Sequence, residues 1–120
     1  MTDSIKMYIF INTDLDMTAG KIASQVGHIV HLIVDQLVRS GYESFPASEE
    51  YKTYLKWNKN CTKIVLKATE EQLKELSKMK SARAFYDNGQ TTQVEQNSLT
   101  VVGFLPGSLE SEFVKDYKLL

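Results

Sequence analysis

Apolar residues in this chain fall into short runs, with one long stretch in which they recur at helical spacing. Residues 6–12 form a short apolar run rich in aromatic side chains, which is typical of a buried strand. Thr18 can cap a helix whose apolar spacing continues to about Arg39. Ser40 and Gly41 are expected to end it. The pattern therefore predicts a buried strand followed by one long amphipathic helix.

The rest of the chain predicts shorter elements in alternation. Ser48 opens a helix that runs to about Trp57. Thr69 and Gln72 form a capping box before a helix that runs to about Lys80. Three further apolar runs are expected to be strands, at residues 62–67, 83–87 and 99–104.

This alternation predicts an α/β fold: a three-layer sandwich in which a four-stranded mixed β-sheet is flanked by helices on both faces. Strands with a helix between them are expected to be parallel neighbours. The loop of about eleven residues before 99–104 instead allows the last two strands to run antiparallel. A last short helix follows Pro106. No linker or repeat divides the chain, so we expect a single domain over residues 1–120.

Composition argues against several classes of protein, among them disulfide-rich and membrane-spanning proteins. The chain is 42% hydrophobic and 24% charged, as in ordinary globular proteins, and its single cysteine, Cys61, allows neither a disulfide framework nor a cysteine-based metal site. The start of the chain carries only a short apolar run, and no run approaches the ~20 residues that cross a bilayer. We therefore expect a soluble cytoplasmic protein with no membrane partner.

Charge is distributed unevenly along the chain. The net charge of −1 argues against a nucleic-acid partner, but residues 52–83 hold nine Lys or Arg and three Glu, a local balance of +6 against −7 for the remainder. Such an asymmetry can orient a polyanion on one face of the molecule. A solvated, lysine-rich surface would have the same composition, and charge alone leaves both interpretations open.

Three polar residues interrupt the long helix: Lys21, Gln25 and His28, which fall within roughly 60° of one another on a helical wheel. A lysine in the first turn lies beside the positive end of the helix dipole, which costs ~0.3–1 kcal/mol and favours a carboxylate or phosphate nearby. An ordinary polar helix face is the alternative, and His28 with His31 lacks a third metal ligand. The apolar residues are expected to cover the opposite side: Ile22, Val26, Ile29, Val30, Ile33, Val34 and Leu37.

The stretch "FYDNGQTTQ" at 85–93 follows a predicted strand and carries a second set of polar groups. Ligands of α/β sheets lie at strand ends and in the adjoining loops. Asp87 could hold a water or a protonated amine there, and Thr91 or Thr92 could donate a hydrogen bond. A plain Asp-Asn-Gly turn is the alternative. No P-loop, nucleophile elbow or dinucleotide fingerprint is present, so the residues by themselves predict a polar site that combines a cation with a carboxylate.

Taken together, "DLDMTAGKIASQVGH", "KIVLK", "DNGQTTQ", "LTVVGFLP" and the terminal "KLL" resemble the archaeal and eukaryotic type of peptidyl-tRNA hydrolase, in order from about Lys6 to Leu120. The most specific piece is M-x-x-G-K-x-A-x-Q-x-x-H, here Met17, Gly20, Lys21, Ala23, Gln25 and His28. The resemblance implies an enzyme that hydrolyses the ester between a stalled peptide and the 3′-terminal ribose of tRNA. It implies peptidyl-tRNA as partner, no DNA, and neither a metal nor an organic cofactor. Family members are often homodimers, which leaves a dimer open for this chain.

The resemblance also assigns roles to residues. It implies that Lys21, Asp87 and Thr92 are catalytic, with Lys21 polarising the ester carbonyl and Asp87 orienting or deprotonating the attacking water. Further residues are expected to bind the substrate: Gln25, His28, Gly20, Gln93, Thr91, Lys52, Lys56, Lys59 and Lys63. The four lysines among them are expected to contact the tRNA backbone.

The chain departs from the family's pattern in the loop after Asp87. One extra residue separates Asp87 from the Thr-Gln pair: counting back from Thr100 selects Thr92, whereas counting forward from Asp87 selects Thr91. The Gly-Pro that usually follows the last strand is replaced at 104–106. These departures keep an alternative open, in which the chain is a catalytically impaired member of the family that acts as a tRNA- or protein-binding module.

Overall fold

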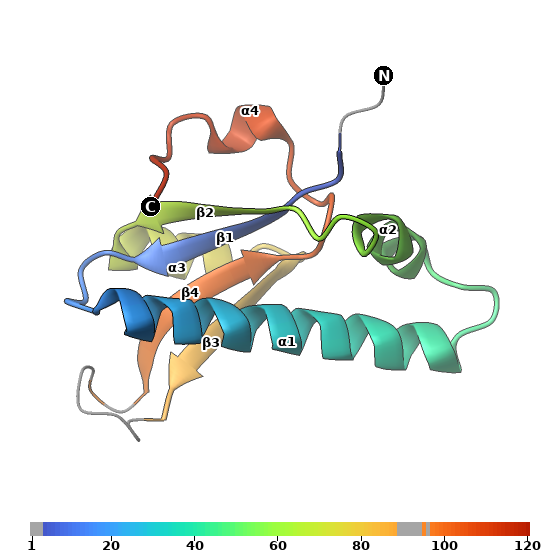
Figure 1. Ribbon diagram of the computed structural model, residues 1–120, viewed down its shortest axis with the longest axis horizontal. Helices are drawn as coiled ribbons and strands as arrows, with labels where there is room; N and C mark the ends of the chain where they lie inside the picture. Colours follow the sequence, from blue (N-terminus) through green and yellow to red (C-terminus); the bar gives the residue numbers. More distant parts are fainter. Residues whose placement is uncertain (1–3, 89–94, 96) are drawn as a thin grey trace.

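The computed structural model describes residues 4–88, 95 and 97–120. Strands and helices alternate along the chain, as the apolar pattern predicts (Figure 1). The elements are β1 (Met7–Asn12), α1 (Ala19–Glu43), α2 (Glu49–Trp57), β2 (Lys63–Ala68), α3 (Glu70–Ser77), β3 (Ala82–Asp87), β4 (Ser98–Phe104) and α4 (Ser111–Val114).

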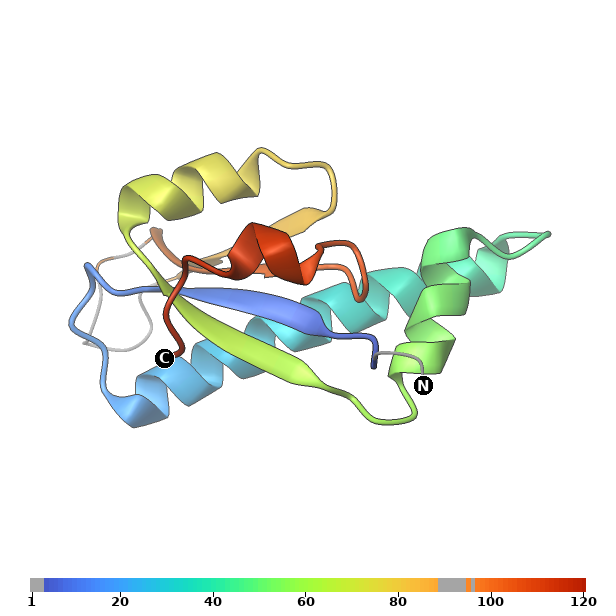
Figure 2. The ribbon, with the colours of Figure 1, turned by 90° about the horizontal axis from the view of Figure 1, so that it is seen from above.

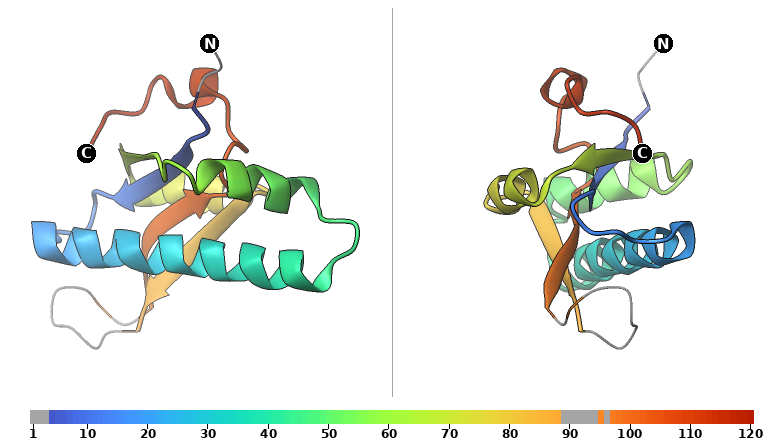
Figure 3. Two further views of the ribbon diagram at one scale, coloured as in Figure 1. Left: turned by 45° about the vertical axis from the view of Figure 1, so that its right-hand side comes forward. Right: turned by 90° about the vertical axis from the view of Figure 1, so that its left-hand side faces the viewer.

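The four strands form one mixed sheet in the order β2-β1-β4-β3. β1 pairs with β2 in parallel and with β4 antiparallel, and β3 and β4 are antiparallel. Helices α1 and α2 cover one face of the sheet, and α3 and α4 cover the other (Figures 2 and 3). The expected mixed sheet flanked by helices on both faces is confirmed, including the antiparallel last two strands.

The core consists of two hydrophobic clusters, one on each face of the sheet. β1 is buried at all six positions because it lies between two strands and under helices on both sides. Ile9 and Ile11 point to the α1 side, whereas Tyr8 and Phe10 point to the α3 side. Alternation across a central strand thus explains why 7–11 is continuously apolar rather than half polar.

Two helix ends differ from the prediction. α1 continues to Glu43, past Ser40 and Gly41, which were expected to end it. Gly41 is buried there, and the ring of Tyr51 on α2 occupies the space where a side chain at position 41 would lie. Packing of α2 therefore stabilises the last turn against the local preference of glycine. α3 ends earlier than expected, at Ser77, with Lys78 as its cap.

An irregularity in β4 shapes the end of the sheet nearest the start of α1. Phe85 of β3 pairs with Val101, but Tyr86 pairs with Leu99, so Thr100 has no partner opposite it. Leu99 packs on the α3 side, whereas Val101 and the side chain of Thr100 both face α1. Two consecutive side chains on one face are the signature of a β-bulge, a device that re-aims a side chain.

Among the described residues, no helix combines the length and the hydrophobicity that crossing a bilayer requires.

Candidate active site

Two charged side chains meet in the interior, at the junction of α1 and β3. Lys21 lies in the first turn of α1 and Asp87 is the last residue of β3. The Nζ of Lys21 is 2.5 Å from Oδ2 of Asp87, and the two side chains are only 5% and 6% exposed. Of the two negative partners expected for a lysine at this helix end, the structure supplies the carboxylate.

Gln25 extends this ion pair into a directed chain of hydrogen bonds. Its Nε2 donates to the same Oδ2 of Asp87 at 3.1 Å, and the hydroxyl of Thr100 donates to its Oε1 at 2.6 Å. A carboxylate only accepts hydrogen bonds, so the amide must turn its NH₂ toward Asp87 and its oxygen toward Thr100. Both Gln25 and Thr100 are fully buried. The bulge in β4 therefore serves the site, because it aims Thr100 at Gln25.

The expected polar stripe on α1 is wrong in one respect. Lys21 and Gln25 do not lie on a solvent-facing side opposite the apolar residues; they continue the buried line of Ile29, Ile33 and Leu37, at steps of four residues. Hydropathy alone assigns polar side chains to the surface. Here the sheet offers hydrogen-bonding partners at the start of the helix, and burial of a paired polar group is then tolerated.

His28 occupies a different place from the other two members of the stripe. It is exposed, its ring centroid lies 4.9 Å from that of Phe85 with the planes tilted by 31°, and its Nε2 is 3.3 Å from Oγ of Ser24. Across the described part of the chain, no group of three or more His, Cys, Asp or Glu is placed to hold a metal ion.

Asn12 supports the segment that leads into α1. It ends β1, is 1% exposed, and donates from Nδ2 to the carbonyl of Leu99 at 2.8 Å. Its Oδ1 accepts from the backbone N–H of Asp14 at 2.9 Å, and the carboxylate of Asp14 accepts from the N–H of Glu70 at 2.8 Å. Asn12 therefore ties the carboxyl end of β1 to β4 and to the start of α3.

The start of α1 is set by a local cap. The hydroxyl of Thr18 accepts from the N–H of Lys21 at 3.2 Å, which satisfies one of the unpaired donors of the first turn and fixes where the helix begins. Because the cap fixes where the helix begins, it also fixes the position along the helix axis from which Lys21 reaches Asp87. Gly20, the neighbouring residue, is exposed, and a Cβ there would meet no atom within 4 Å.

Sequence reasoning missed Asn12 and Thr100. Each left a signal in the sequence, since each is a polar residue at the edge of an otherwise apolar strand. In an α/β sheet such a residue at a strand end is a candidate for the site. The loop residues Gly89, Thr91, Thr92 and Gln93 lie outside the described residues, and the choice between Thr91 and Thr92 stays a prediction.

The structure does not bring the expected tRNA-binding lysines to the ion pair. α2 packs against the last turns of α1, where Gly41 meets Tyr51, about 30 Å from Lys21 at 1.5 Å per helical residue. Lys52 forms an exposed ion pair with Glu49 at 3.3 Å, and Lys63 donates to the carbonyl of Cys61 at 2.8 Å. The remaining two, Lys56 and Lys59, are exposed at the end of α2 and in the turn after it.

The described residues also form a cavity away from the ion pair. It measures about 850 Å³ and lies between the second half of α1, the start of α2 and the segment 105–108. Its lining mixes hydroxyl side chains with charges of both signs, and it includes neither Lys21 nor Asp87. Buried charge, rather than cavity size, therefore marks the candidate site.

Comparison with known proteins shows the family to which this chain is related. A family model described as "Peptidyl-tRNA hydrolase PTH2" matches residues 5–120. A "Peptidyl-tRNA hydrolase" of Sulfolobus acidocaldarius is 35% identical over 97% of this chain and 100% of its own length. One from Metallosphaera sedula is 32% identical, again over 97% of this chain and all of the relative. A "Probable peptidyl-tRNA hydrolase 2" of Schizosaccharomyces pombe is 32% identical over 85% of this chain and 48% of the relative. The chain therefore belongs to the PTH2 family of peptidyl-tRNA hydrolases.

Proposed function

We propose that this protein hydrolyses the ester between the peptide of a peptidyl-tRNA and the 3′-terminal ribose of the tRNA. The observation that carries the proposal is the buried pair of Lys21 and Asp87, to which Gln25 is hydrogen-bonded, in a chain of the PTH2 family. The relatives from Sulfolobus acidocaldarius and Metallosphaera sedula carry the name of this activity. A buried ion pair is not needed for folding, because apolar residues of similar size often stabilise a core at least as well.

Ester hydrolysis makes two demands that this pair can meet. Water has to lose a proton as it attacks the carbonyl carbon, and the carbonyl oxygen becomes negatively charged in the tetrahedral intermediate. Asp87 orients the water and accepts its proton. Lys21 lies against Asp87 and provides the positive charge that stabilises the oxyanion, an interaction that is stronger in a site that excludes water.

Gln25 and Thr100 act on Asp87 rather than on the ester. Lys21 and Gln25 both donate to Oδ2, and these two contacts help to hold the carboxylate in a defined orientation. Thr100 fixes the amide that does the holding. We propose that Thr92 completes the site with a hydrogen bond to the water or the carbonyl, as the family resemblance implies.

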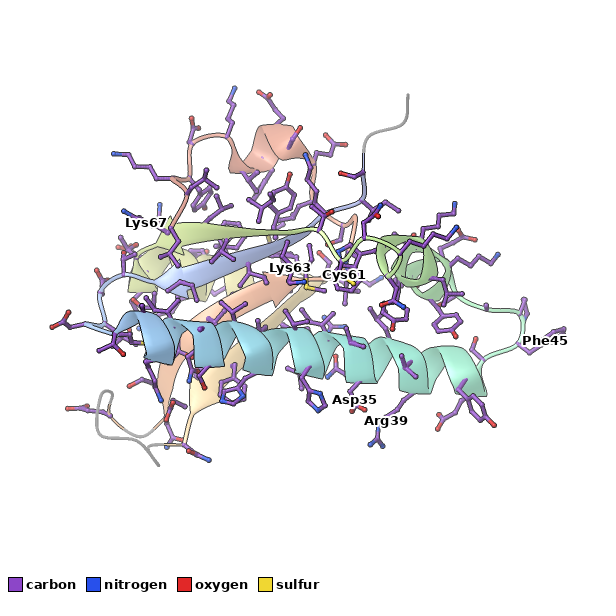
Figure 4. All side chains as sticks on the ribbon, in the orientation of Figure 1. Asp35, Arg39, Phe45, Cys61, Lys63 and Lys67 are labelled. Atoms are coloured by element: carbon purple, nitrogen blue, oxygen red, sulfur yellow. The ribbon has the colours of Figure 1, made fainter. Side chains whose placement is uncertain are left out.

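The tRNA backbone is proposed to run from the ion pair to the lysines at the far end of α1. Lys63 and Lys67 share one face of the edge strand β2, and Lys67 lies beside Ile11 near the carboxyl end of β1 (Figure 4). They link the start of α1 with the exposed lysines of α2 and of the turn after it: Lys52, Lys56 and Lys59. An acceptor arm that lies along this line would keep its 3′ end at Asp87.

Cleavage of an N-blocked aminoacyl-tRNA by the purified protein tests the proposal. We expect turnover well above spontaneous hydrolysis, and a loss of ~10²-fold or more in Lys21→Ala, on the scale of losing one electrostatic participant. His31→Ala, on the exposed face of the same helix, is the matched control. A wild-type rate equal to spontaneous hydrolysis, with tRNA binding retained, would establish the binding-module alternative instead.

We also propose a cytoplasmic location, where such a substrate arises, and a homodimer, as the family resemblance leaves open. Sedimentation equilibrium of the purified protein over a range of concentrations tests the second point. A single species of 13.6 kDa, the mass of one chain, at every concentration would contradict it.

A further inference from the structure

Two aromatic rings lie beside the ion pair. Phe85 precedes Asp87 by two residues and points to the same face of β3, about 7 Å along the strand. His28 lies two turns beyond Lys21 on α1. The two rings, whose planes are tilted by 31°, are here called the ring platform, and they lie next to the carboxylate of Asp87 along β3.

The ring platform is held in place before any ligand binds. The imidazole of His28 is exposed, yet one of its faces lies near the ring of Phe85 at a centroid distance of 4.9 Å. Its edge contacts the hydroxyl of Ser24, one turn earlier on the helix, at 3.3 Å. Phe85 is half-buried and packs against the α1-side core. An exposed ring held at its edge and on one face loses little conformational entropy when a partner stacks on it.

We propose that the ring platform stacks the base of the 3′-terminal nucleotide of the tRNA. The inference rests on the proposed function, because the ester fixes what lies next to the ion pair. In an aminoacyl ester of tRNA, a single ribose separates the carbonyl from the terminal base. A base one sugar away from Lys21 and Asp87 falls in the region of the ring platform. Aromatic and imidazole rings are common stacking partners of unpaired bases, whose π-faces are sequence-independent.

The charges around the ring platform fit this use. Arg83 lies two residues before Phe85 on the same face of β3, and its Nε donates to Gln36 of α1 at 2.8 Å. The neighbouring cation is therefore directed to the helix, and the exposed surface of the platform is aromatic rather than ionic. Such a surface suits the flat face of a base better than a phosphate.

A binding measurement with a non-cleavable ligand separates this inference from catalysis. The ligand is an amide analogue, 3′-(N-acetylglycyl)amino-3′-deoxyadenosine, and its control is the same amide on a ribose that lacks the base. Glycine is used so that no amino-acid side chain competes for the rings. Calorimetry should show wild-type protein binding the adenine analogue about tenfold more tightly than the base-free one, the size expected for one stacked base.

Variants of the ring platform decide the outcome. His28→Ala should abolish the tenfold preference for the analogue with a base, and His28→Phe should retain it because a flat ring remains. Phe85→Leu keeps an apolar group of similar volume in the core and should weaken the preference, while His31→Ala should leave it intact. An unchanged preference in His28→Ala would overturn the inference.

Kinetics provides the second readout. For N-blocked aminoacyl-tRNA, His28→Ala should raise KM about tenfold with kcat unchanged, whereas loss of kcat at constant KM would mean that His28 acts on the ester instead.

The two measurements also separate this inference from the proposed function. If wild-type protein cleaves the ester but binds both analogues equally, the ring platform does not stack a base and the proposed function stands. If it does not cleave the ester, the proposed function fails, and the calorimetry still reports whether the rings bind a base.

Discussion

Lys21 and Asp87 take two charges out of water, which costs several kcal/mol for each ion before their attraction is counted. A contact of 2.5 Å and the additional hydrogen bond from Gln25 offset that cost. Removal of one partner leaves the other charge buried and uncompensated. Mutational tests of this site therefore have to separate a loss of stability from a loss of chemistry.

Lys21→Met should lower the free energy of unfolding by about 3–5 kcal/mol, the scale for breaking a buried pair. Lys21→Met combined with Asp87→Asn should recover much of that loss, because no charge is left buried and the new amide can still accept from Gln25. Neither variant should cleave the ester. Urea unfolding and the cleavage assay measure the two effects separately. A single variant as stable as wild type would show that the pair is solvated in solution.

Thr100 provides a second test at the residue scale. Thr100→Val keeps the branched shape but leaves Oε1 of Gln25 without its donor, which should cost about 1–3 kcal/mol of stability. The amide is then free to turn, and kcat should fall about tenfold as Asp87 loses its fixed orientation. Thr100→Ser retains the hydroxyl and should restore both values. Equal behaviour of the two variants would exclude a role for the hydroxyl.

At the scale of elements, one buried line of residues on α1 contributes both to the candidate site and to the packing of the core. Its first turns place Lys21 and Gln25 in the site, and its last turns pack against α2 through Gly41. Between them the line consists of Ile29, Ile33 and Leu37, which belong to the core on that face of the sheet. The candidate site and the core contacts thus share one face of the helix. A bend in α1 would change the position of Lys21 relative to the end that packs against α2.

Two glycines of α1 should respond to alanine in opposite directions. A Cβ at Gly27 meets nothing within 4 Å, so Gly27→Ala should raise stability by about 0.5–1 kcal/mol through helix propensity. A Cβ at Gly41 would overlap the ring of Tyr51, so Gly41→Ala should destabilise by about 1–3 kcal/mol. Thermal unfolding measures both, and kcat/KM of Gly27→Ala should equal the wild-type value. A stabilising Gly41→Ala would contradict the packing of α2 on α1.

At the scale of the whole molecule, the Lys21–Asp87 pair and the lysine-rich helix α2 lie at opposite ends of α1. The molecule is elongated, with extents of 43, 31 and 25 Å, and its long axis follows that helix in Figure 1. A substrate that reaches both ends must itself be long. This arrangement suits a tRNA acceptor arm better than a short peptide ester, and it makes binding and chemistry separable by mutation.

A triple alanine variant at Lys52, Lys56 and Lys59 should bind tRNA with a weaker salt dependence. Each phosphate contact that is lost should reduce the slope of log K against log salt by about 0.7–0.9. Cleavage of a short N-blocked aminoacyl-adenosine ester should be unaffected, because that ester cannot reach α2. A triple variant on the α3–α4 face serves as the control for total charge: Lys74, Lys78 and Lys115 changed to alanine. Equal slopes in both variants would show that Lys52, Lys56 and Lys59 are merely solvated.

Local patterns were sufficient to locate the strands and helices and to predict a mixed sheet. Hydrophobic spacing, the caps at Thr18 and Ser48 and the capping box at Thr69 depend only on residues a few positions apart. The residues by themselves also predicted a polar site that combines a cation with a carboxylate, and the family resemblance assigned Lys21 and Asp87 to it. Local patterns placed the end of α1 too early at Arg39, because the contact that sustains the last turns comes from Tyr51 on another helix.

Burial within the site was settled only by the folded molecule. Lys21 and Gln25 are polar, and no neighbour in the sequence indicates that they face the core. Their partners Asp87 and Thr100 lie 66 and 75 residues away along the chain, respectively. Thr100 reaches Gln25 because a bulge turns it toward α1, a consequence of how β3 and β4 pair. A polar side chain is buried where distant residues satisfy its hydrogen bonds, and those partners exist only once the sheet and helix have come together.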